Sequence, residues 1–306
     1  MLEYLSSLPG AVAQGAIWGL MALGVYITFK ILDIADLTVD GSFATGGIVA
    51  AVLITSGVNF FVAILIAFVA GLACGFVTGI LHTVLGIPAI LAGILTQMAL
   101  WSINLKIAGG RSNIAISARR FELIFSQANI GDTLWKMAII LVAVIALLYL
   151  FFGTELGASI RATGNNKKMA KSLGINTKMN IVIGLSLSNG LVALAGALLA
   201  QYQGFGDINM GRGAIVIGLC TIVIGTALFG RIAKNFAVRL TTVVAGGIIY
   251  YVIFQSVVFL GIDTDLLKML AAIIVAVFLG VPYIKKKYWK KFKKILRDRR
   301  MMREAD

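Results

Sequence analysis

The chain has 306 residues, of which 59% are hydrophobic and only 13% are charged, and its mean hydropathy is +0.96. Such a high value excludes an ordinary soluble domain. The formal net charge of +14 would point to a nucleic-acid partner in a soluble protein. In a membrane protein the informative feature is which loops hold the basic residues. The charge-free window from Gly41 to Leu105 has room for about three spans of roughly 20 residues. We therefore expect an all-α polytopic membrane protein and no nucleic-acid partner.

Apolar runs, separated by charges or by Gly, Pro, Asn and Ser, predict about nine hydrophobic segments. In chain order these segments are 9–29, 41–55, 60–81, 88–105, 137–153, 181–203, 214–230, 240–261 and 267–284. The first is expected to be a permanent span, because the residues before it lack the basic region and cleavage pattern of a secretory signal. One transmembrane domain over residues 1–284 accounts for nearly the whole sequence.

The second predicted segment is short and rich in small residues. Its first turns hold Gly41, Ser42, Thr45, Gly46 and Gly47. Irregular backbone at membrane depth is tolerated only where it is buried in protein or lines a water-filled cavity. The segment is therefore interpreted either as a broken or re-entrant element beside a cavity or as a plain short span.

The placement of Lys and Arg predicts the orientation, because short cytoplasmic loops collect these residues. Residues 285–306 carry 11 basic and 3 acidic residues, with aromatic residues interleaved at helical spacing. We expect this stretch to be a basic amphipathic cytoplasmic tail that lies on anionic membrane lipid. Alternation through nine segments then places the N-terminus outside, or inside if the second segment is re-entrant.

Small residues recur at helical spacing on two predicted spans. On the third span they are Ala67, Gly71, Gly75 and Gly79, and on the sixth they are Gly190, Ala193 and Ala197. Small faces of this kind let neighbouring helices approach closely. We expect close helix packing at both, and no internal repeat is recognisable in the sequence itself.

The polar segment 154–180, between the fifth and sixth spans, predicts two short helices. Residues 164–166, Gly-Asn-Asn, are a helix stop and cap signal, and the basic turns 167–173 end at Gly174. Three apolar side chains would line one edge of the second helix: Met169, Ala170 and Leu173. An apolar edge with basic flanks, held between two spans, favours a docking element for a cytosolic partner.

The sequence contains no motif typical of a catalytic or nucleotide-binding site. It has no GxxxxGK[ST], HExxH or GxSxG pattern and no paired-carboxylate motif. Cys74, Cys220 and the single histidine, His82, form no cluster, so neither a metal nor a cofactor is expected. A membrane-embedded enzyme would need a cluster of acid, base or nucleophile at the interface, which only the aspartates of residues 33–40 could supply. The spans hold essentially no ionisable residues, which argues against an ion-coupled carrier. An ion-coupled secondary transporter or a channel stays as the alternative, although it lacks its usual charged residues.

The docking segment carries a motif, Arg161-Ala-x-Gly164-Asn165-Asn166-x-x-x-Ala170-x-x-x-Gly174-Ile175, followed by a span that contains Leu194-Ala195-Gly196. In this the sequence resembles the membrane permeases of ATP-binding-cassette importers of the branched-chain amino acid and ribose type, over about residues 10–282. The resemblance implies that the segment is a coupling helix that inserts in a groove of a separate cytosolic ATPase. The implied coupling residues are Arg161, Gly164, Asn165, Asn166, Lys167, Ala170, Lys171, Leu173, Gly174 and Ile175.

Two further stretches, 36–43 (DLTVDGSF) and 99–105 (ALWSINL), look like a subgroup often described as tryptophan or tyrosine transporters. Branched-chain members carry a different motif at 40–42. The resemblance implies a bacterial inner-membrane subunit that imports a small solute, with an aromatic amino acid favoured. It also implies three kinds of protein partner: the cytosolic ATPase, an extracytoplasmic solute-binding protein and a second permease copy, as a homodimer.

Polar residues near the second segment and in three other spans are the candidates for a solute pathway. Asp33, Asp36 and Asp40 have i+3 and i+4 spacing, so they could share one face of a short helix and cap it, with gating or solute contact as the alternative. The expected pathway-lining residues are Thr38, Asp40, Ser42, Gln97, Asn104 and Asn189. Hydrogen bonds between helices are the alternative for the neutral side chains.

Overall fold

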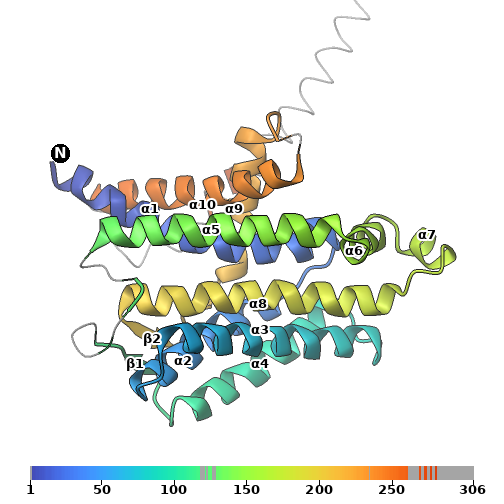
Figure 1. Ribbon diagram of the computed structural model, residues 1–306, viewed down its shortest axis with the longest axis horizontal. Coiled ribbons are helices and arrows are strands. Elements are labelled where there is room, and N and C mark those ends of the chain that lie inside the picture. Colours follow the sequence, from blue (N-terminus) through green and yellow to red (C-terminus); the bar gives the residue numbers. More distant parts are fainter. Residues whose placement is uncertain are drawn as a thin grey trace, which may run out of the picture.

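The computed structural model describes residues 2–117, 121, 123–125, 129–233 and 235–260, with isolated positions between 269 and 280. Its elements are α1 (Leu2–Tyr26), η1 (Ile27–Ile31), α2 (Thr38–Thr55), α3 (Phe60–Thr83), α4 (Ala89–Ile107), β1 (Asn113–Ala115), α5 (Ile130–Gly153), α6 (Glu155–Asn165), α7 (Lys167–Ser172), α8 (Thr177–Gln203), β2 (Phe205–Asp207), α9 (Ala214–Phe229) and α10 (Phe236–Phe259). Figure 1 shows one bundle of long helices, with α6 and α7 at one end and the strands at the other. We call these the α7 end and the strand end.

Seven of the described helices are long and apolar enough to cross a membrane, with η1 counted as part of the first. They match seven of the predicted segments: α1, α2, α3, α4, α5, α8 and α10. The eighth match is α9, which has only 16 residues and is short for a full span. The ninth predicted segment, 267–284, and the tail, 285–306, lie outside the described residues except for isolated positions. The count of nine is therefore not confirmed.

The second predicted segment is a continuous helix rather than a broken one. α2 runs from Thr38 to Thr55, and most of its residues are buried. The irregular backbone lies instead in the connector before it, residues 32–37, which follows η1. α2 begins where it does because Asp36 Oδ1 accepts a hydrogen bond from the Thr38 backbone N–H at 2.9 Å. The plain short span is thus the better of the two interpretations.

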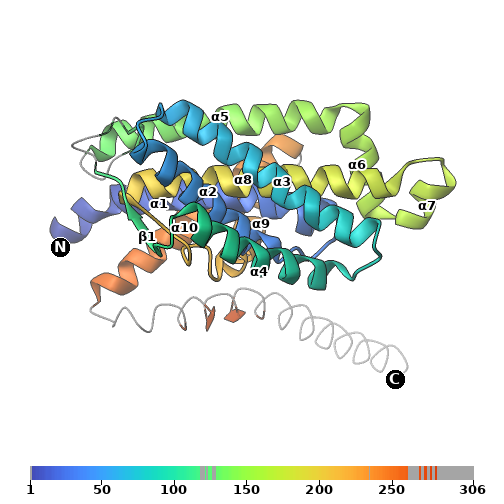
Figure 2. The ribbon, with the colours of Figure 1, turned by 90° about the horizontal axis from the view of Figure 1, so that it is seen from below.

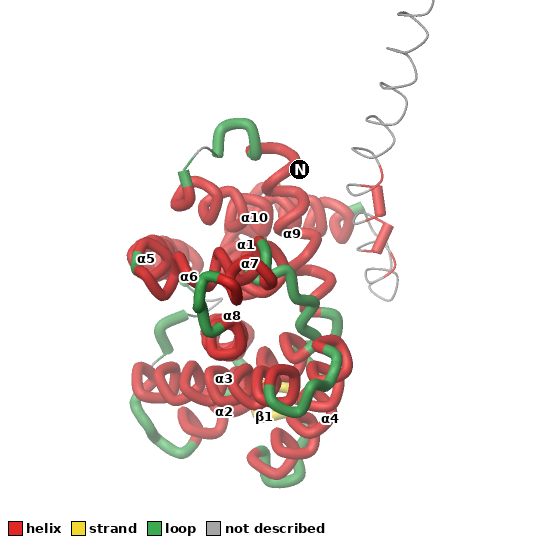
Figure 3. The backbone as a smooth tube through the Cα atoms, turned by 90° about the vertical axis from the view of Figure 1, so that its right-hand side faces the viewer, coloured by secondary structure: helices red, strands yellow, loops and turns green. Residues whose placement is uncertain are grey.

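Close packing of small residues holds α8 against its neighbours, as predicted. Figure 3 shows α8 near the centre of the end-on view, and α8 packs against α1, α2 and α3. A Cβ added at Gly71 would overlap Ala193, and one added at Gly75 would overlap the Leu185 backbone. Ala67 is likewise buried, in the same small cluster as Ala197. These contacts confirm the predicted small faces on α3 and α8.

The chain contains two halves with the same succession of elements, α1 to α3 and α8 to α10. In each half a long helix leads into an irregular connector, then a short helix, then another long helix. Both connectors contain the same turn. Asp36 accepts from the N–H of Thr38, and Asp207 Oδ1 accepts from the N–H of Asn209 at 2.7 Å. The two connectors are thus locally alike although their sequences differ.

The two halves run in opposite directions. α1 and α8 are antiparallel, because Gly24 contacts Ser188 while the Tyr202 hydroxyl donates to the Gly10 carbonyl at 3.2 Å. α1 packs on α10 of the other half, just as α8 packs on α3. This is the packing of an inverted repeat, which the sequence did not reveal.

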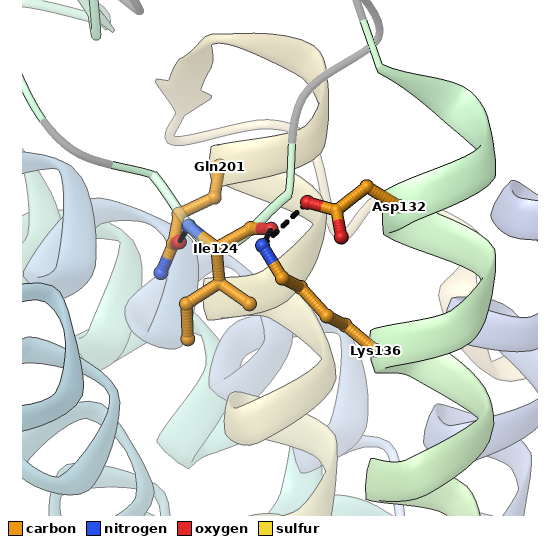
Figure 4. Close-up of polar contacts among 4 residues, drawn as sticks. All are labelled: Ile124, Asp132, Lys136 and Gln201. Carbon is orange, nitrogen blue, oxygen red and sulfur yellow. Dashed lines mark hydrogen bonds and ion pairs between the residues drawn. The ribbon is translucent and has the colours of Figure 1, made fainter.

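At the strand end, β1 and β2 pair antiparallel, with Asn113 opposite Asp207. Figure 4 shows a second set of contacts at this end, the hydrogen bonds of Ile124. The Ile124 backbone N–H donates to Gln201 Oε1 of α8 at 3.3 Å, and its carbonyl accepts from Lys136 Nζ of α5 at 3.4 Å. Lys136 also forms an ion pair with Asp132 at 2.6 Å. Ile124 is thereby attached to both α8 and α5.

Candidate functional site

The short helices α2 and α9 begin close to each other, and one carboxylate joins them. Asp40 lies in the first turn of α2, and its two oxygens accept hydrogen bonds from the backbone N–H groups of Gly213 and Ile215, each at 2.9 Å. N–H groups at the start of a helix have no partner within that helix and carry a partial positive charge. Asp40 therefore caps α9, the helix of the other half, rather than its own.

The three aspartates do not share one helix face, which corrects the prediction. Only Asp40 lies within α2, whereas Asp36 precedes it and Asp33 is exposed with a φ of 55°. The connector passes close to α4. A Cβ at Gly93 of α4 would come within 2.8 Å of the Leu37 backbone nitrogen. Asp36 alone accepts a hydrogen bond from the start of α2, as predicted, whereas Asp40 caps α9 instead.

A pocket of about 250 Å³ opens beside Asp40, and we call it the α2–α4 pocket. Its walls are the first turns of α2, one face of α4 and the connector between β2 and α9. Figure 2 shows α4 at the edge of the bundle, across α2. The lining residues are Asp40, Gly41, Ala44, Gln97, Met98, Trp101, Asn104, Ile208 and Arg212. A cation, a carboxylate, two amides and an aromatic ring surround a space of the size of a small solute.

Asn104 is the unusual member of this lining. Its side chain is buried, and neither its amide nitrogen nor its amide oxygen has a hydrogen-bond partner among the described residues. An unsatisfied buried polar group costs about 1–3 kcal/mol. Native structures contain few such groups, and each needs an explanation.

Behind the pocket lies a fully buried polar network. The Asn189 amide donates to Asp36 Oδ2 and accepts from the Ser42 hydroxyl, both at 2.7 Å. Asn189 lies near the middle of the 27-residue α8, so the Asp36 carboxyl is held at the depth of the apolar core. We expected essentially no ionisable residues within the spans. Asp36 lies between two predicted segments, so its burial at this depth was not foreseen.

The six predicted pathway residues fall into two groups. Asp40, Gln97 and Asn104 line the α2–α4 pocket. The other three, Thr38, Ser42 and Asn189, are completely buried and bond between helices. Thr38, for example, shares a hydrogen bond of 2.7 Å with Thr78 of α3, which in turn donates to Thr96 of α4. In this conformation their role is to hold α2 in place.

Sequence reasoning missed Arg212 as a pocket residue. Its position, between Gly211 and Gly213 directly before an apolar run, was the available signal. Gly211 sits so close to the Asp40 carbonyl that a side chain there would overlap it. The small residue thus lets the connector carry Arg212 to the start of α2.

At the α7 end, both short helices of the segment 154–180 are present, as α6 and α7. The Asn166 side chain accepts from the Met169 N–H at 3.0 Å and so caps α7. Gly174 follows it with a φ of 80°, a left-handed conformation that suits glycine. The predicted stop and cap signals are confirmed.

The exposed fractions of Met169, Ala170 and Leu173 correct the prediction that all three line one apolar edge of the second helix. Met169 and Leu173 are 60% and 69% exposed, whereas Ala170 is only 2% exposed. Ala170 thus anchors α7 to the rest of the protein, and of the three predicted residues Met169 and Leu173 present apolar surface. The difference arises because successive helix positions point in different directions, which a six-residue helix makes hard to judge from sequence.

Cations gather beside this segment. Lys30 of η1, Arg161 of α6 and Arg239 of α10 line a pocket of about 680 Å³, in which Asp33 is the acidic residue. Gly164 packs against the Ile31 carbonyl with no room for a side chain. The α7 end therefore combines a rigidly attached loop with a basic surface.

Comparison with known proteins decides the family. The sequence profile of the branched-chain amino acid transport system, permease component, matches residues 8–281. The chain belongs to this permease family. A tyrosine transport system permease protein of Clostridioides difficile (strain R20291) is 40% identical to the permease over 276 residues, which cover 90% of the permease and 91% of that protein.

The permease is also similar to the autoinducer 2 import system permease protein LsrC of Escherichia coli O9:H4 (strain HS), at 30% identity over 73% of the permease and 65% of that protein. Two solved structures share its fold. PsaBC from Streptococcus pneumoniae, in complex with Fab, has a TM-score of 0.52 at 16% identity and covers 92% of the permease and 95% of its own chain. An inward-facing ABC transporter of metal-chelate type has a TM-score of 0.51 at 17% identity and covers 92% of the permease and 85% of its own chain.

The permease is thus a multi-pass inner-membrane subunit of an ATP-binding-cassette importer. It is not itself an enzyme, because ATP hydrolysis belongs to a separate ATPase subunit in this class of transporter. An ion-coupled carrier or a channel is not favoured.

Proposed function

We propose that the permease imports an amino acid, with an aromatic one favoured. The observation that carries this proposal is the 40% identity with a tyrosine transport system permease over nine-tenths of both chains. The α2–α4 pocket agrees with it, since its lining combines the positive charge of Arg212 with the aromatic ring of Trp101. The pathway would pass this pocket, with Gln97 and Asn104 in its wall.

The test is uptake of labelled tyrosine, tryptophan and leucine by cells that express the permease with its ATPase and its solute-binding protein. Saturable uptake of tyrosine or tryptophan, which excess leucine does not inhibit, is the expected result. Uptake of leucine alone would contradict the aromatic specificity. ATP depletion at clamped ion gradients should abolish the uptake, because the energy comes from the ATPase.

We further propose that the α6–α7 segment is the coupling helix that docks in a groove of the ATPase. Met169 and Leu173 offer exposed apolar contacts, and the exposed Lys167 and Lys171 flank them with positive charge. The close contact of Gly164 with Ile31 and the burial of Ala170 attach the segment firmly, so a push on it would reach the spans. A flexible loop could not transmit such a movement to the spans.

Charge reversal tests the docking directly. Lys167→Glu combined with Lys171→Glu should abolish co-purification of the ATPase and uptake, while the permease still folds, because both side chains are exposed. The matched control is Lys106→Glu, another exposed lysine, in the last turn of α4, which leads to β1 at the strand end. Retained ATPase in the double variant would refute the docking assignment.

The rest of the assembly is proposed on the same basis. If α7 faces the cytoplasm, the crossings of α1 to α10 place the N-terminus outside, and a span over 267–284 would return the tail, 285–306, to the cytoplasm and its anionic lipid. A solute-binding protein would then dock at the strand end. A second permease copy, as a homodimer, would complete the pathway.

A further inference from the structure

The α2–α4 pocket lies where the two inverted halves meet. Asp40 and Gly41 come from the short helix of the first half, and Ile208 and Arg212 come from the connector before the short helix of the second. In secondary transporters built from inverted repeats, solute sites lie at the interface of the repeats, and two short or interrupted helices in corresponding positions point to them. α2 and α9 are such a pair, with 18 and 16 residues.

Asn104 gives independent support for a ligand in this pocket. Its exposed fraction is 1%, it lines the cavity, and both of its amide atoms lack partners among the described residues. A neighbouring helix does not satisfy it, in contrast to Asn189, whose amide has a partner for each end. A bound group that both accepts and donates hydrogen bonds would remove the penalty of the unpaired amide.

The charges of the pocket indicate which group that is. Both oxygens of Asp40 are occupied by the N–H groups at the start of α9, whose partial positive charge offsets the carboxylate. Arg212 is exposed and forms no ion pair with any residue that the structure describes. The charge left available to a ligand is therefore positive.

We propose that the α2–α4 pocket binds a small solute through its carboxylate, with Asn104 and Arg212 as the specificity-determining residues. The guanidinium of Arg212 pairs with the carboxylate, and Asn104 Nδ2 donates to it. The apolar part of the solute lies against Met98 and Trp101. This inference rests on the proposed import function and adds the residues and the functional group by which the pathway recognises its solute.

The test is direct binding to the purified permease–ATPase complex in detergent. The probes are tyrosine, tryptophan and phenylalanine, together with tyramine, tryptamine and phenethylamine, which have the same rings without the carboxylate. At least one of the acids should bind, and its amine should bind at least tenfold more weakly. Asn104→Leu and Arg212→Gln should each weaken binding of that acid by roughly 10- to 100-fold, the effect of losing a hydrogen bond to a charged group.

Two further readouts separate recognition from folding. Because Asn104 loses no hydrogen bond within the described protein, Asn104→Leu should leave the melting temperature unchanged or raise it. Ser102→Leu, at an exposed position of the same helix outside the pocket, is the control and should bind the acid normally. A lowered melting temperature in Asn104→Leu would assign that residue a structural role and overturn its part in the proposal, while the exposed Arg212 still tests the carboxylate contact.

Equal binding of acids and amines, unchanged affinity in both variants, or no binding of any probe would overturn the proposal. Failure of the importer function itself would look different. In that case the ATPase would be missing from the purified complex, or ATP depletion would leave uptake intact.

Discussion

The Asp40 carboxylate and the Gly213 backbone N–H, 2.9 Å apart, form a direct hydrogen bond between the two inverted halves of the permease. The same carboxylate also accepts from Ile215, so it satisfies two N–H groups at the start of α9. The position of this short helix, and with it one wall of the α2–α4 pocket, depends on a side chain from the other half.

Replacement of Asp40 by alanine should destabilise the permease by about 0.5–2 kcal/mol, the usual cost of losing a helix cap, and should reduce uptake. Denaturant unfolding of the purified protein and uptake in cells provide the measurements. Asp132→Asn is the control, because among the described residues that carboxylate makes an exposed ion pair with Lys136, worth about 0–1 kcal/mol. Equal stability of the two variants would show that Asp40 is not an important cap.

Asn189→Leu should be more damaging than Ser42→Ala. The leucine leaves the buried Asp36 carboxyl without its amide donor, whereas the alanine removes only one hydroxyl donor from the network. We expect a loss of about 1–3 kcal/mol for Asn189→Leu and about 1 kcal/mol for Ser42→Ala. Thermal unfolding in detergent measures both, and the reverse order would contradict the network as described.

Gly196→Ala should force α8 away from α2. An added Cβ would overlap the Phe43 carbonyl, which cannot move without shifting the helix. Overpacking of this kind costs about 1–3 kcal/mol, and a lowered melting temperature would report it. Gly153→Ala is the matched control, because its Cβ would meet nothing within 4 Å, and its stability should stay within a few tenths of a kcal/mol.

Two apolar positions in and beside α7 should respond differently to substitution. Ala170→Trp places a large side chain in a buried site and should loosen the segment, seen as faster cleavage by protease in the loop. Leu173→Ser changes an exposed residue and should leave that cleavage rate unaltered while it weakens association with the ATPase at least severalfold. If both variants behaved alike, burial would not distinguish an anchor from a docking contact.

Much of the fold was predictable from the apolar runs, from the charged, Gly, Pro, Asn and Ser residues that separate them, and from the helical spacing of small residues. The capping residue Asn166 and the small residues Gly71 and Gly75 act over short distances or at regular spacing, so the sequence displays their role directly. Seven spans and both short helices of the docking segment were found in this way.

The candidate site was predictable only in part, because it depends on contacts between distant positions. Asp40 is 173 positions from Gly213, and no local pattern shows that its oxygens cap a helix of the other half. The burial of Asp36 was hidden for the same reason, since its partner Asn189 is 153 positions away. Asn104 was predicted as a polar pathway residue, but only the structure shows that it has no partner among the described residues.

The mixed origin of the α2–α4 pocket has a mechanical consequence. If one half rocks against the other during the transport cycle, α4 moves with the first half, because it packs on α2 and α3. Gln97 and Asn104 of α4 then travel with the first half and Arg212 with the second. The distance from the Arg212 guanidinium to the amides of Gln97 and Asn104 then changes in each transport cycle. A solute held between them would be gripped in one state and released in the other without any rearrangement inside either half.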